Sequence, residues 1–372
     1  MTETIAQNER TQIQDVRVTA YSIPTDRPES DGTLEWDETT MVLVQISAGG
    51  RTGLGYTYAH AAAGKLIHDK LASVVQGMNP FDIPACWQAM TTVVRNNGES
   101  GLSRMAISAV DGALWDLKAK LLDMSLIRLL GAVREEVPAY GSGGFTSYTI
   151  EQLQEQLGGW AEEGFSMVKM KIGRQPQDDP GRIVAARKAI GDDVSLFVDA
   201  NGGYSQKQAL ALAERFSQWG VSWYEEPVSH LDLDGLHFLQ QRTPGGVEVT
   251  AGEYGFDLGY FRRMIHADAV DVLQADATRC GITGFLQVGT LCETYYLPMS
   301  SHCAPSLHLH VCCSLPVVRH MEYFHDHVRI EHMLFDGAAT AENGTLRPDL
   351  TRPGLGLDFK EQDVCSYAIS TG

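Results

Sequence analysis

Residues 167–227 read MVKMKIGRQPQDDPGRIVAARKAIGDDVSLFVDANGGYSQKQALALAERFSQWGVSWYEEP. The stretch contains three short apolar runs, and helical patterns separate each run from the next. Strands that alternate with helices predict a parallel sheet whose strands are joined by crossover helices. Each run ends in a charged residue, namely Lys171, Asp199 and Glu225. This stretch therefore predicts both a fold class and the place of a site.

The same alternation continues on both sides of the stretch. The candidate strands are Val137–Tyr140, Met167–Ile172, Val194–Ala200, Val221–Glu225, Val247–Gly252, Val270–Ala275, Leu297–Ser301 and Val317–Tyr323. Strands of this number, separated by helices, predict a closed α/β barrel of the TIM type rather than an open sheet. No convincing eighth barrel helix follows the last of them.

The first third of the chain has an α+β pattern. Its β-rich runs are Ile13–Ile23, Met41–Ala48 and Leu54–Tyr58, and helical patterns follow near Gly64–Gln76, Asp82–Val94 and Ser103–Leu122. A polar segment, Pro24–Glu38, lies between the first two runs and contains Trp36. An unstructured segment of this length is either an active-site lid or a disordered surface loop, and the sequence favours neither.

Polar residues end seven successive strands, and consecutive members of the set are between 20 and 28 residues apart. They are Lys171, Asp199, Glu225, Glu253, Asp276, His302 and Glu322. The spacing is about one βα repeat, so we expect all seven at the carboxyl-terminal rim of the barrel. Active sites of such barrels lie at this rim, because each strand delivers one side chain to a common centre.

Three of these residues, Asp199, Glu225 and Glu253, are carboxylates from adjacent strands. Carboxylates held close together repel one another and take up protons unless a cation neutralises them. A ligand set made of oxygen alone favours Mg²⁺ before Mn²⁺ or Ca²⁺. Each residue taken singly is as well explained by a helix cap or a salt bridge, so the metal prediction depends on the three together.

Two other pairs predict proton transfer. Lys169 and Lys171 are two residues apart and should both face the barrel interior, where the first is expected to lower the pKa of the second into the range of a neutral base. The alternative is that both lysines only pair with the acidic rim. His302 is in register with Asp276, which can fix the imidazole tautomer and leave Nε2 directed at a substrate.

A base, a histidine–aspartate pair and a metal together indicate removal of the proton α to a carboxylate, with the metal stabilising the enediolate. The net charge of −18 argues against a nucleic-acid partner. It also means that an anionic substrate needs a local cationic patch, which the metal and the lysines would supply. No apolar run reaches the roughly 20 residues of a membrane span. The polar N-terminus and seven cysteines without paired spacing indicate a reduced, cytoplasmic protein.

These residues resemble the mandelate racemase subgroup of the enolase superfamily over essentially the whole chain. The matching stretches, besides the Asp276 segment, are AISAVDGALWDLKAK (106–120), KMK (169–171), DANGGY (199–204), YEEP (224–227), AGE (251–253) and SSH (300–302). The resemblance implies an α+β N-terminal capping domain over 1–130, a modified TIM barrel, (β/α)7β, over 131–355, and a C-terminal segment, 356–372, that returns to the cap.

The resemblance also implies one Mg²⁺ per subunit on the three carboxylates, with Lys171 and His302 acting on opposite faces of the substrate. It places Asn201 near the metal and Glu322 on the substrate carboxylate. The cap loops around Trp36 and Tyr58 would then select the substrate. The chain departs from the family at DATRCGITG (276–284), where a single Gly281 stands in place of the usual glycine pair, so the resemblance does not predict the geometry of this loop or the contacts of Arg279.

The residue set fits two reaction classes. Elimination of water from a sugar acid makes the protein an acid-sugar dehydratase, which the resemblance favours. Return of the proton on the opposite face makes it a racemase or epimerase of a 2-hydroxy acid or related carboxylate. A metal-binding barrel without catalysis is the third reading. We expect a small-molecule carboxylate substrate, no nucleic acid or membrane partner, and a homo-oligomer.

Overall fold

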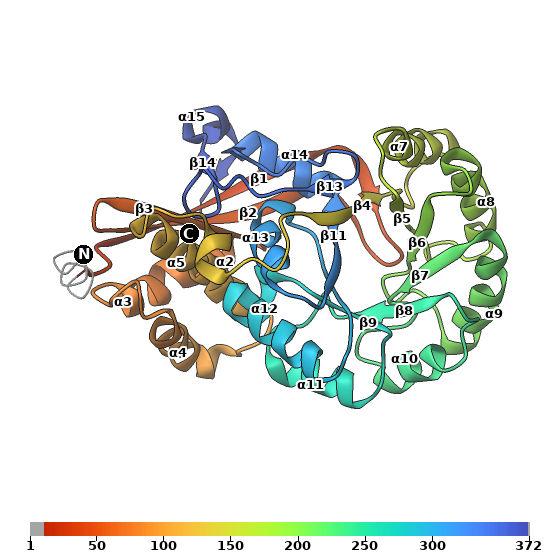
Figure 1. The fold of residues 1–372 in the computed structure, drawn as a ribbon, viewed down its shortest axis with the longest axis horizontal. Helices are drawn as coiled ribbons and strands as arrows, with labels where there is room; N and C mark the ends of the chain where they lie inside the picture. Colours follow the sequence, from red (N-terminus) through yellow and green to blue (C-terminus); the bar gives the residue numbers. More distant parts are fainter. Residues whose placement is uncertain (1–10, 371–372) are drawn as a thin grey trace.

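The computed structural model describes residues 11–370. A four-stranded antiparallel sheet with its helices forms a cap, and a closed barrel of parallel strands lies beside it (Figure 1). The expected modified TIM barrel with an α+β capping domain is confirmed. The boundaries at 130 and 355 stay predictions. No helix in the described ranges is long and apolar enough to cross a membrane.

The cap is built on β1 (Asp15–Ser30), β2 (Glu35–Ala48) and β3 (Arg51–Tyr58), and its helices pack against this sheet or against one another. These helices are α2 (Ala62–Leu66), a π-turn (Ile67–Leu71), α3 (Ala72–Val75), α4 (Ile83–Val94) and α5 (Leu102–Leu121). Helix α5 approaches β3 closely because Gly53 and Gly55 lack a Cβ, which would lie 2.2 Å from backbone atoms of Ala113. The short C-terminal strand β15 (Ala368–Ile369) pairs with β1, so this part of the C-terminal segment lies on the sheet of the cap.

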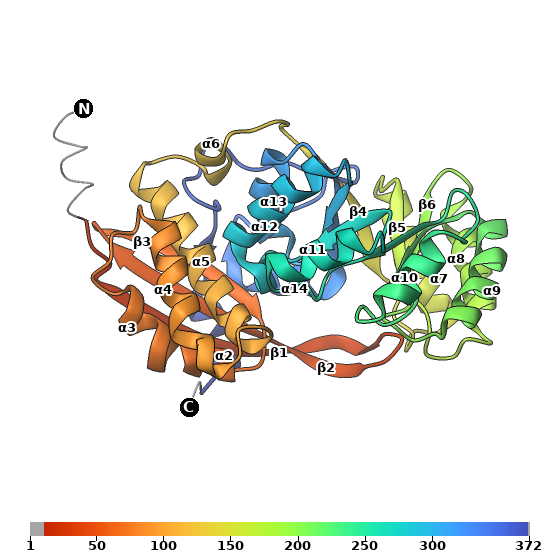
Figure 2. The ribbon, with the colours of Figure 1, turned by 90° about the horizontal axis from the view of Figure 1, so that it is seen from below.

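The segment Pro24–Glu38 is an antiparallel ribbon with an irregular stretch, so neither a lid without structure nor a disordered loop describes it. Strands β1 and β2 stay paired as far as Ser30 and Glu35, past a register shift between Pro24 and Glu29. A turn at residues 31–34 closes the ribbon, and Asp31 Oδ1 accepts hydrogen bonds from the backbone of two of its residues. The sequence did not predict these strands, because the segment contains prolines and polar residues and lacks a regular alternation of apolar and polar side chains. Figure 2 shows the ribbon reaching from the cap along the barrel.

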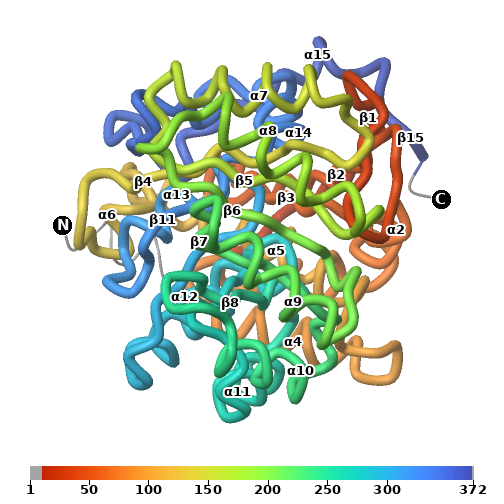
Figure 3. The backbone as a smooth tube through the Cα atoms, turned by 90° about the vertical axis from the view of Figure 1, so that its right-hand side faces the viewer, coloured from red at the N-terminus to blue at the C-terminus, as the bar shows by residue number. Residues whose placement is uncertain are grey.

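The barrel strands run in sequence order, and the last pairs with the first, which closes the barrel. They are β4 (Val137–Gly143), β5 (Met167–Lys171), β6 (Ser195–Asp199), β7 (Val221–Glu225), β8 (Glu248–Ala251), β9 (Val272–Ala275), β10 (Met299–Ser301) and β11 (Val318–Phe324). The connecting helices are α7 (Ile150–Glu162), α8 (Asp179–Ile190), α9 (Gln206–Phe216), α10 (Leu233–Gln240), α11 (Leu258–His266), α12 (Ala277–Thr294) and α13 (Pro305–Ser314). Figure 1 and Figure 3 show α7 to α10 around the outside of the strands, with α8 and α9 farthest from the cap.

A helix, α14 (His325–Leu334), follows the eighth strand, where the sequence showed no convincing eighth barrel helix. Its sequence is rich in histidine and charge, which obscured the helical pattern. It connects barrel and cap, since Arg329 donates to the carbonyl of Pro24 and Asp326 accepts from Thr39. The remaining short elements are α6 (Leu126–Leu130) before the barrel and β12 (Phe335–Asp336), β13 (Thr345–Leu346), β14 (Asp358–Phe359) and α15 (Glu361–Val364) after it.

Below its charged rim the barrel interior holds an aromatic floor, made of Tyr140, Phe197, Trp223 and His320. Each lies two residues before a polar residue of the rim and faces the same way, since side chains alternate along a strand. Phe197 stacks on Trp223 with ring centroids 5.1 Å apart. The floor excludes water from beneath the site, which strengthens the electrostatic interactions above it.

Candidate active site

The row formed by Lys171, Asp199 and Glu225 lies across three neighbouring strands. Lys171 is the direct partner of Asp199 in the pairing of β5 with β6, and Asp199 is the direct partner of Glu225 in that of β6 with β7. Glu253 joins the row from the turn after β8, where Gly252 has a φ of 135°. A Cβ on Gly252 would lie 2.1 Å from the carbonyl of Gln274, so this turn requires glycine.

The three expected metal ligands do come together. One oxygen from each of Asp199, Glu225 and Glu253 lies within 4.8 Å of the others, and all three residues are buried. Burial and the charge of Asp199 raise the pKa of Glu225. Glu253 Oε2 and Asn201 Oδ1, also buried, accept no hydrogen bond from the described part of the chain. A hard divalent cation would satisfy this set of oxygens, so the residues present fit one.

The lysines face the interior as expected, and both are ion-paired. Lys169 Nζ lies 2.7 Å from Glu225 Oε2 and 2.7 Å from Glu322 Oε1, and Lys171 Nζ lies 2.5 Å from Asp199 Oδ2. Burial lowers the pKa of Lys171, but Asp199 and further carboxylates outweigh burial and the Lys169 ammonium, and raise it. The expectation of a lowered pKa is wrong for this state, in which the lysines pair with the acidic rim. A divalent cation on Asp199 would weaken that attraction and lower the pKa of Lys171.

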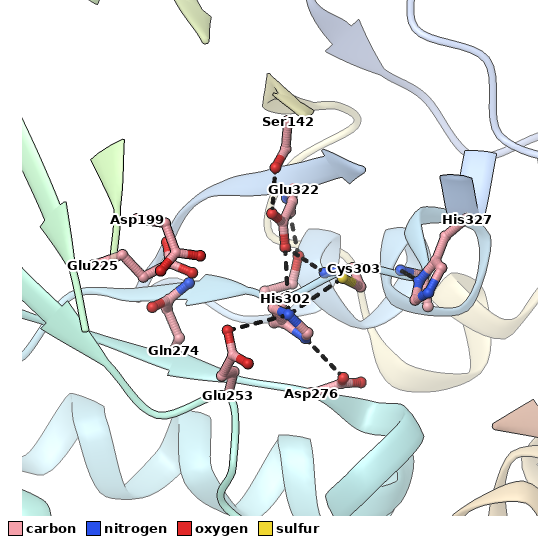
Figure 4. A network of polar contacts seen from close by, with 12 residues as sticks. Ser142, Asp199, Glu225, Glu253, Gln274, Asp276, His302, Cys303, Glu322 and His327 are labelled. Atoms are coloured by element: carbon pink, nitrogen blue, oxygen red, sulfur yellow. Dashed lines mark hydrogen bonds and ion pairs between the residues drawn. The ribbon is translucent and has the colours of Figure 1, made fainter. Parts of the chain in front are cut away.

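His302 and Asp276 form the expected pair. His302 Nδ1 lies 2.9 Å from Asp276 Oδ2, and Nε2 faces Glu253 Oε2 at 3.3 Å (Figure 4). Burial lowers the pKa of His302, but Glu253 and the hydrogen bond with Asp276 outweigh burial and hold it above its ordinary value. Asp276 Oδ1 also accepts from the backbone of Thr278 and caps α12. The imidazolium is therefore favoured here, which suits a proton donor.

Both carboxylate oxygens of Glu322 already have partners within the protein. Its Oε1 accepts from Ser142 Oγ at 2.6 Å and pairs with Lys169, while Oε2 accepts from the backbone N–H of Cys303 at 2.7 Å. Burial raises the pKa of Glu322, but Lys169 outweighs burial and holds it well below its ordinary value. An ionised carboxylate has no proton to donate to a substrate carboxylate, so this geometry favours a supporting role. The predicted contact with substrate stays a prediction.

A cavity of about 370 Å³ opens above these residues. Lys171, His302, Asp276, Glu253 and Asn201 line it from the barrel, and Trp36, Tyr58 and His60 line it from the cap. A larger groove of about 840 Å³ lies elsewhere, along Thr146–Ile150 and Arg174, and none of the candidate catalytic residues lines it. We therefore assign the site to the smaller cavity, where the ionisable groups converge.

Tyr254, Cys303 and His327, which had not been singled out from the sequence, also line this cavity, as does Arg279. Cys303 Sγ lies 3.2 Å from His302 Nε2, and His327 stacks on Tyr58 with ring centroids 3.4 Å apart. Arg279 donates to the carbonyl of Glu253 and lies 4.5 Å from the Tyr254 ring centroid. The sequence offered only weak signals for them, such as the HDH run at 325–327, because their contacts depend on other elements.

Gly281 lies in the loop where the chain departs from the family pattern. Gly281 has a φ of 75° and interrupts α12, and a Cβ there would lie 2.7 Å from the Trp87 ring and 2.8 Å from Asp111 Oδ2. One glycine is thus required at this point and is present. Arg279 remains directed at Glu253 and Asp276, at 3.6 and 3.7 Å.

Two family models match the chain. Residues 14–131 match the mandelate racemase/muconate lactonizing enzyme N-terminal domain, and residues 152–363 match the enolase C-terminal domain-like family. The chain belongs to the enolase superfamily. Within it, the N-terminal match places the protein in the mandelate racemase/muconate lactonizing enzyme group, as the sequence resemblance implied.

Known members of the superfamily match it along most of its length. L-talarate/galactarate dehydratase of Salmonella typhimurium is 29% identical over 94% of this chain and 89% of its own. A 3,6-anhydro-α-L-galactonate cycloisomerase of Streptomyces coelicolor is 30% identical over 94% of this chain and 98% of its own. The crystal structure of a mandelate racemase/muconate lactonizing enzyme-like protein from Rubrobacter xylanophilus has a TM-score of 0.94 and 52% identity, covering 96% and 100% of the two chains. A structure of an L-talarate/galactarate dehydratase variant liganded with Mg and L-glucarate has a TM-score of 0.90 and 27% identity, covering 98% and 94%.

Proposed function

We propose that this enolase-superfamily enzyme is an acid-sugar dehydratase, which removes the proton α to a carboxylate and then expels the β-hydroxyl. The observation that carries the proposal is the convergence of three groups on one cavity: Lys171, the His302–Asp276 pair and the carboxylate triad. A base, an acid and a site for positive charge are the parts that this elimination needs.

Asp199, Glu225 and Glu253 would hold Mg²⁺, which supplies the positive charge that stabilises an enediolate. The relative liganded with Mg and L-glucarate supports this choice of ion. Asn201 donates its backbone N–H to Asp199 Oδ1 at 2.9 Å and so orients one ligand. Lys169 donates to both oxygens of Glu225 and fixes a second.

Lys171 and His302 would carry the proton transfers. Lys171 in its neutral form takes the α-proton, and the C–H electron pair passes into the enediolate. His302, protonated and oriented by Asp276, then gives its Nε2 proton to the β-oxygen, so the C–O bond breaks and water leaves. The enol formed in this way becomes a 2-keto-3-deoxy acid by taking up a proton at the β-carbon.

The substrate class is supported by the cavity and by the relatives. Trp36 and Tyr58 are the cap residues that we assign to substrate selection, and both line the cavity. His60, Arg279 and Asn201 add polar groups, which suit a polyhydroxylated acid. The relative named L-talarate/galactarate dehydratase acts on sugar acids, as its name states.

An isomerase is the second candidate. If the β-oxygen belongs to a ring, the same two proton transfers open the ring without loss of water, and the relative named as a cycloisomerase favours this variant. Racemisation or epimerisation would instead follow if the residue on the opposite face returned the proton to the α-carbon. A metal-binding barrel without catalysis is disfavoured because every residue of the proposed machinery is present.

A substrate panel in D₂O with Mg²⁺ separates these functions. The panel should contain aldonates, aldarates, and their lactones and anhydro forms. We expect a 2-keto-3-deoxy acid from an open-chain sugar acid. A keto acid formed only from ring substrates would make the protein a cycloisomerase, and α-deuterium with inverted configuration would make it a racemase or epimerase. Neither product nor exchange across the panel would overturn the catalytic proposal.

Two further expectations belong with this function. We propose a homo-oligomer in the cytoplasm, acting on a free small molecule rather than on nucleic acid or a membrane. Light scattering coupled to size-exclusion chromatography gives the oligomeric state, and a single-subunit mass would contradict it.

A further inference from the structure

A second cluster of metal-ligating side chains lies outside the catalytic cavity, where the β1–β2 ribbon meets α14. Asp26 and Glu29 come from β1, and His325 is the first residue of α14. One ligand atom from each lies within 4.8 Å of the other two, and His325 Nε2 is 3.1 Å from Asp26 Oδ2. The ribbon runs past α14 in Figure 2, so the cluster joins the cap to the barrel.

Glu29 is the unusual member. Its side chain is fully buried, at 0% exposure, and Oε2 accepts a hydrogen bond from Trp36 Nε1 at 2.9 Å. Oε1 is buried and has no hydrogen-bond partner within residues 11–370. A buried carboxylate oxygen without a partner is costly, so the site lacks a positive or proton-donating group.

The neighbouring arginines are engaged elsewhere. Arg329 donates to Asp326 Oδ1 and to the carbonyl of Pro24. Arg27 lies over the Tyr148 ring and 3.9 Å from Glu155. Neither arginine forms a hydrogen bond or ion pair with Glu29 in the part of the chain that the structure describes, so Oε1 receives no cationic partner from them.

We propose that Asp26, Glu29 and His325 form a second divalent-metal site, distinct from the catalytic triad and selective for Zn²⁺. One imidazole and two carboxylates are a mixed nitrogen and oxygen set, which Zn²⁺ accepts readily and Mg²⁺ does not favour. Asp26 and His325 are partly exposed and also line a cavity of about 250 Å³, so an ion can enter and water can complete its coordination.

The site would stabilise the ribbon against the barrel. An ion there bridges β1 of the cap to α14, and the same Glu29 carboxylate holds Trp36, which lines the catalytic cavity. Binding would therefore restrict Trp36 and the cap over the substrate. This last consequence rests on the proposed function, whereas the binding of Zn²⁺ does not.

The test is a ZnCl₂ titration of the whole chain by calorimetry, with Mg²⁺ saturating so that the triad is filled. We expect wild type to bind one Zn²⁺ equivalent that His325→Gln binds at least about tenfold more weakly. His68→Gln is the matched control, since His68 lies 3.0 Å from Asp69 on an exposed surface with no third ligand among residues 11–370, and it should bind like wild type.

Two further variants keep the result interpretable. Glu29→Gln should also fail to bind this Zn²⁺ equivalent. If Glu29→Gln does not fold, the result for His325→Gln is sufficient, because His325 is partly exposed. Zn²⁺ should change the tryptophan fluorescence of wild type but not of Trp36→Phe. No Zn²⁺ equivalent in wild type, or an unchanged affinity in His325→Gln, would overturn the site, and neither result depends on turnover.

Discussion

Lys171 and Asp199 stand opposite each other on β5 and β6, with Nζ of the lysine 2.5 Å from Oδ2 of the aspartate. The same aspartate belongs to the carboxylate triad. An ammonium and a divalent cation therefore compete for one carboxylate. Binding of the cation and loss of the Lys171 proton should favour each other. Lys171 should therefore become a neutral base only when a cation occupies the carboxylate triad.

Removing the lysine should separate metal binding from catalysis. We expect Lys171→Met to bind Mg²⁺ at least as tightly as wild type, because the competing ammonium is gone. Turnover and α-proton exchange should fall by about 10²- to 10⁴-fold. Calorimetry with MgCl₂ and exchange in D₂O measure the two effects, and Lys65→Met, at a surface ion pair with Asp69, is the control. Unchanged turnover in Lys171→Met would exclude Lys171 as the base.

Asp276→Asn should change both the rate and the pH profile. The amide can keep the cap on Thr278, but it no longer holds the imidazolium of His302, whose pKa should fall. We expect kcat to drop by about 10²- to 10⁴-fold and the alkaline limb of the kcat profile to move to lower pH. An alkaline limb at the wild-type pH would show that Asp276 does not tune His302.

Removal of metal should abolish activity and lower stability together. We expect EDTA to stop turnover and Mg²⁺ to restore it. Mg²⁺ at 100 times its Kd should stabilise the fold by about 2.7 kcal/mol, since only the folded triad binds it. The shift in Tm should be present in wild type and absent in Glu253→Gln. Turnover that survives EDTA would contradict a metal-dependent reaction.

His320 should make the fold sensitive to acid. Burial first, then Arg319 and Lys169, lower its pKa to about 3, well below the ordinary value of 6.5. Below pH 6.5 the unfolded chain therefore binds a proton that the folded chain refuses, so stability falls as pH drops towards 3. The contribution is about 2 kcal/mol between pH 6.5 and pH 5.

The variant His320→Gln isolates this contribution. We expect its unfolding free energy, measured with urea at several pH values, to fall less steeply with acid than that of wild type. Parallel pH profiles for the two proteins would show that His320 is not the responsible group.

The sequence by itself determined the barrel and the composition of its rim. Strand and helix patterns are local, and one polar residue per βα repeat is a periodicity that can be counted along the chain. The placement of Lys171, Asp199, Glu225, Glu253 and His302 followed from it, because parallel strands must bring their carboxyl ends to one rim. The pairing of His302 with Asp276 followed for the same reason.

Only the tertiary structure decided the charge states and the cap contacts. The raised pKa of Lys171 and the engagement of Glu322 depend on distances of a few ångströms across strands, which sequence spacing does not contain. The ribbon over Pro24–Glu38 and its cluster with His325 bring together residues about 300 positions apart. Burial and contacts between residues far apart in the sequence depend on the folded structure. The order of these residues in the sequence therefore predicts the chemistry of the site, whereas their neighbours in the fold set their pKa values and their contacts.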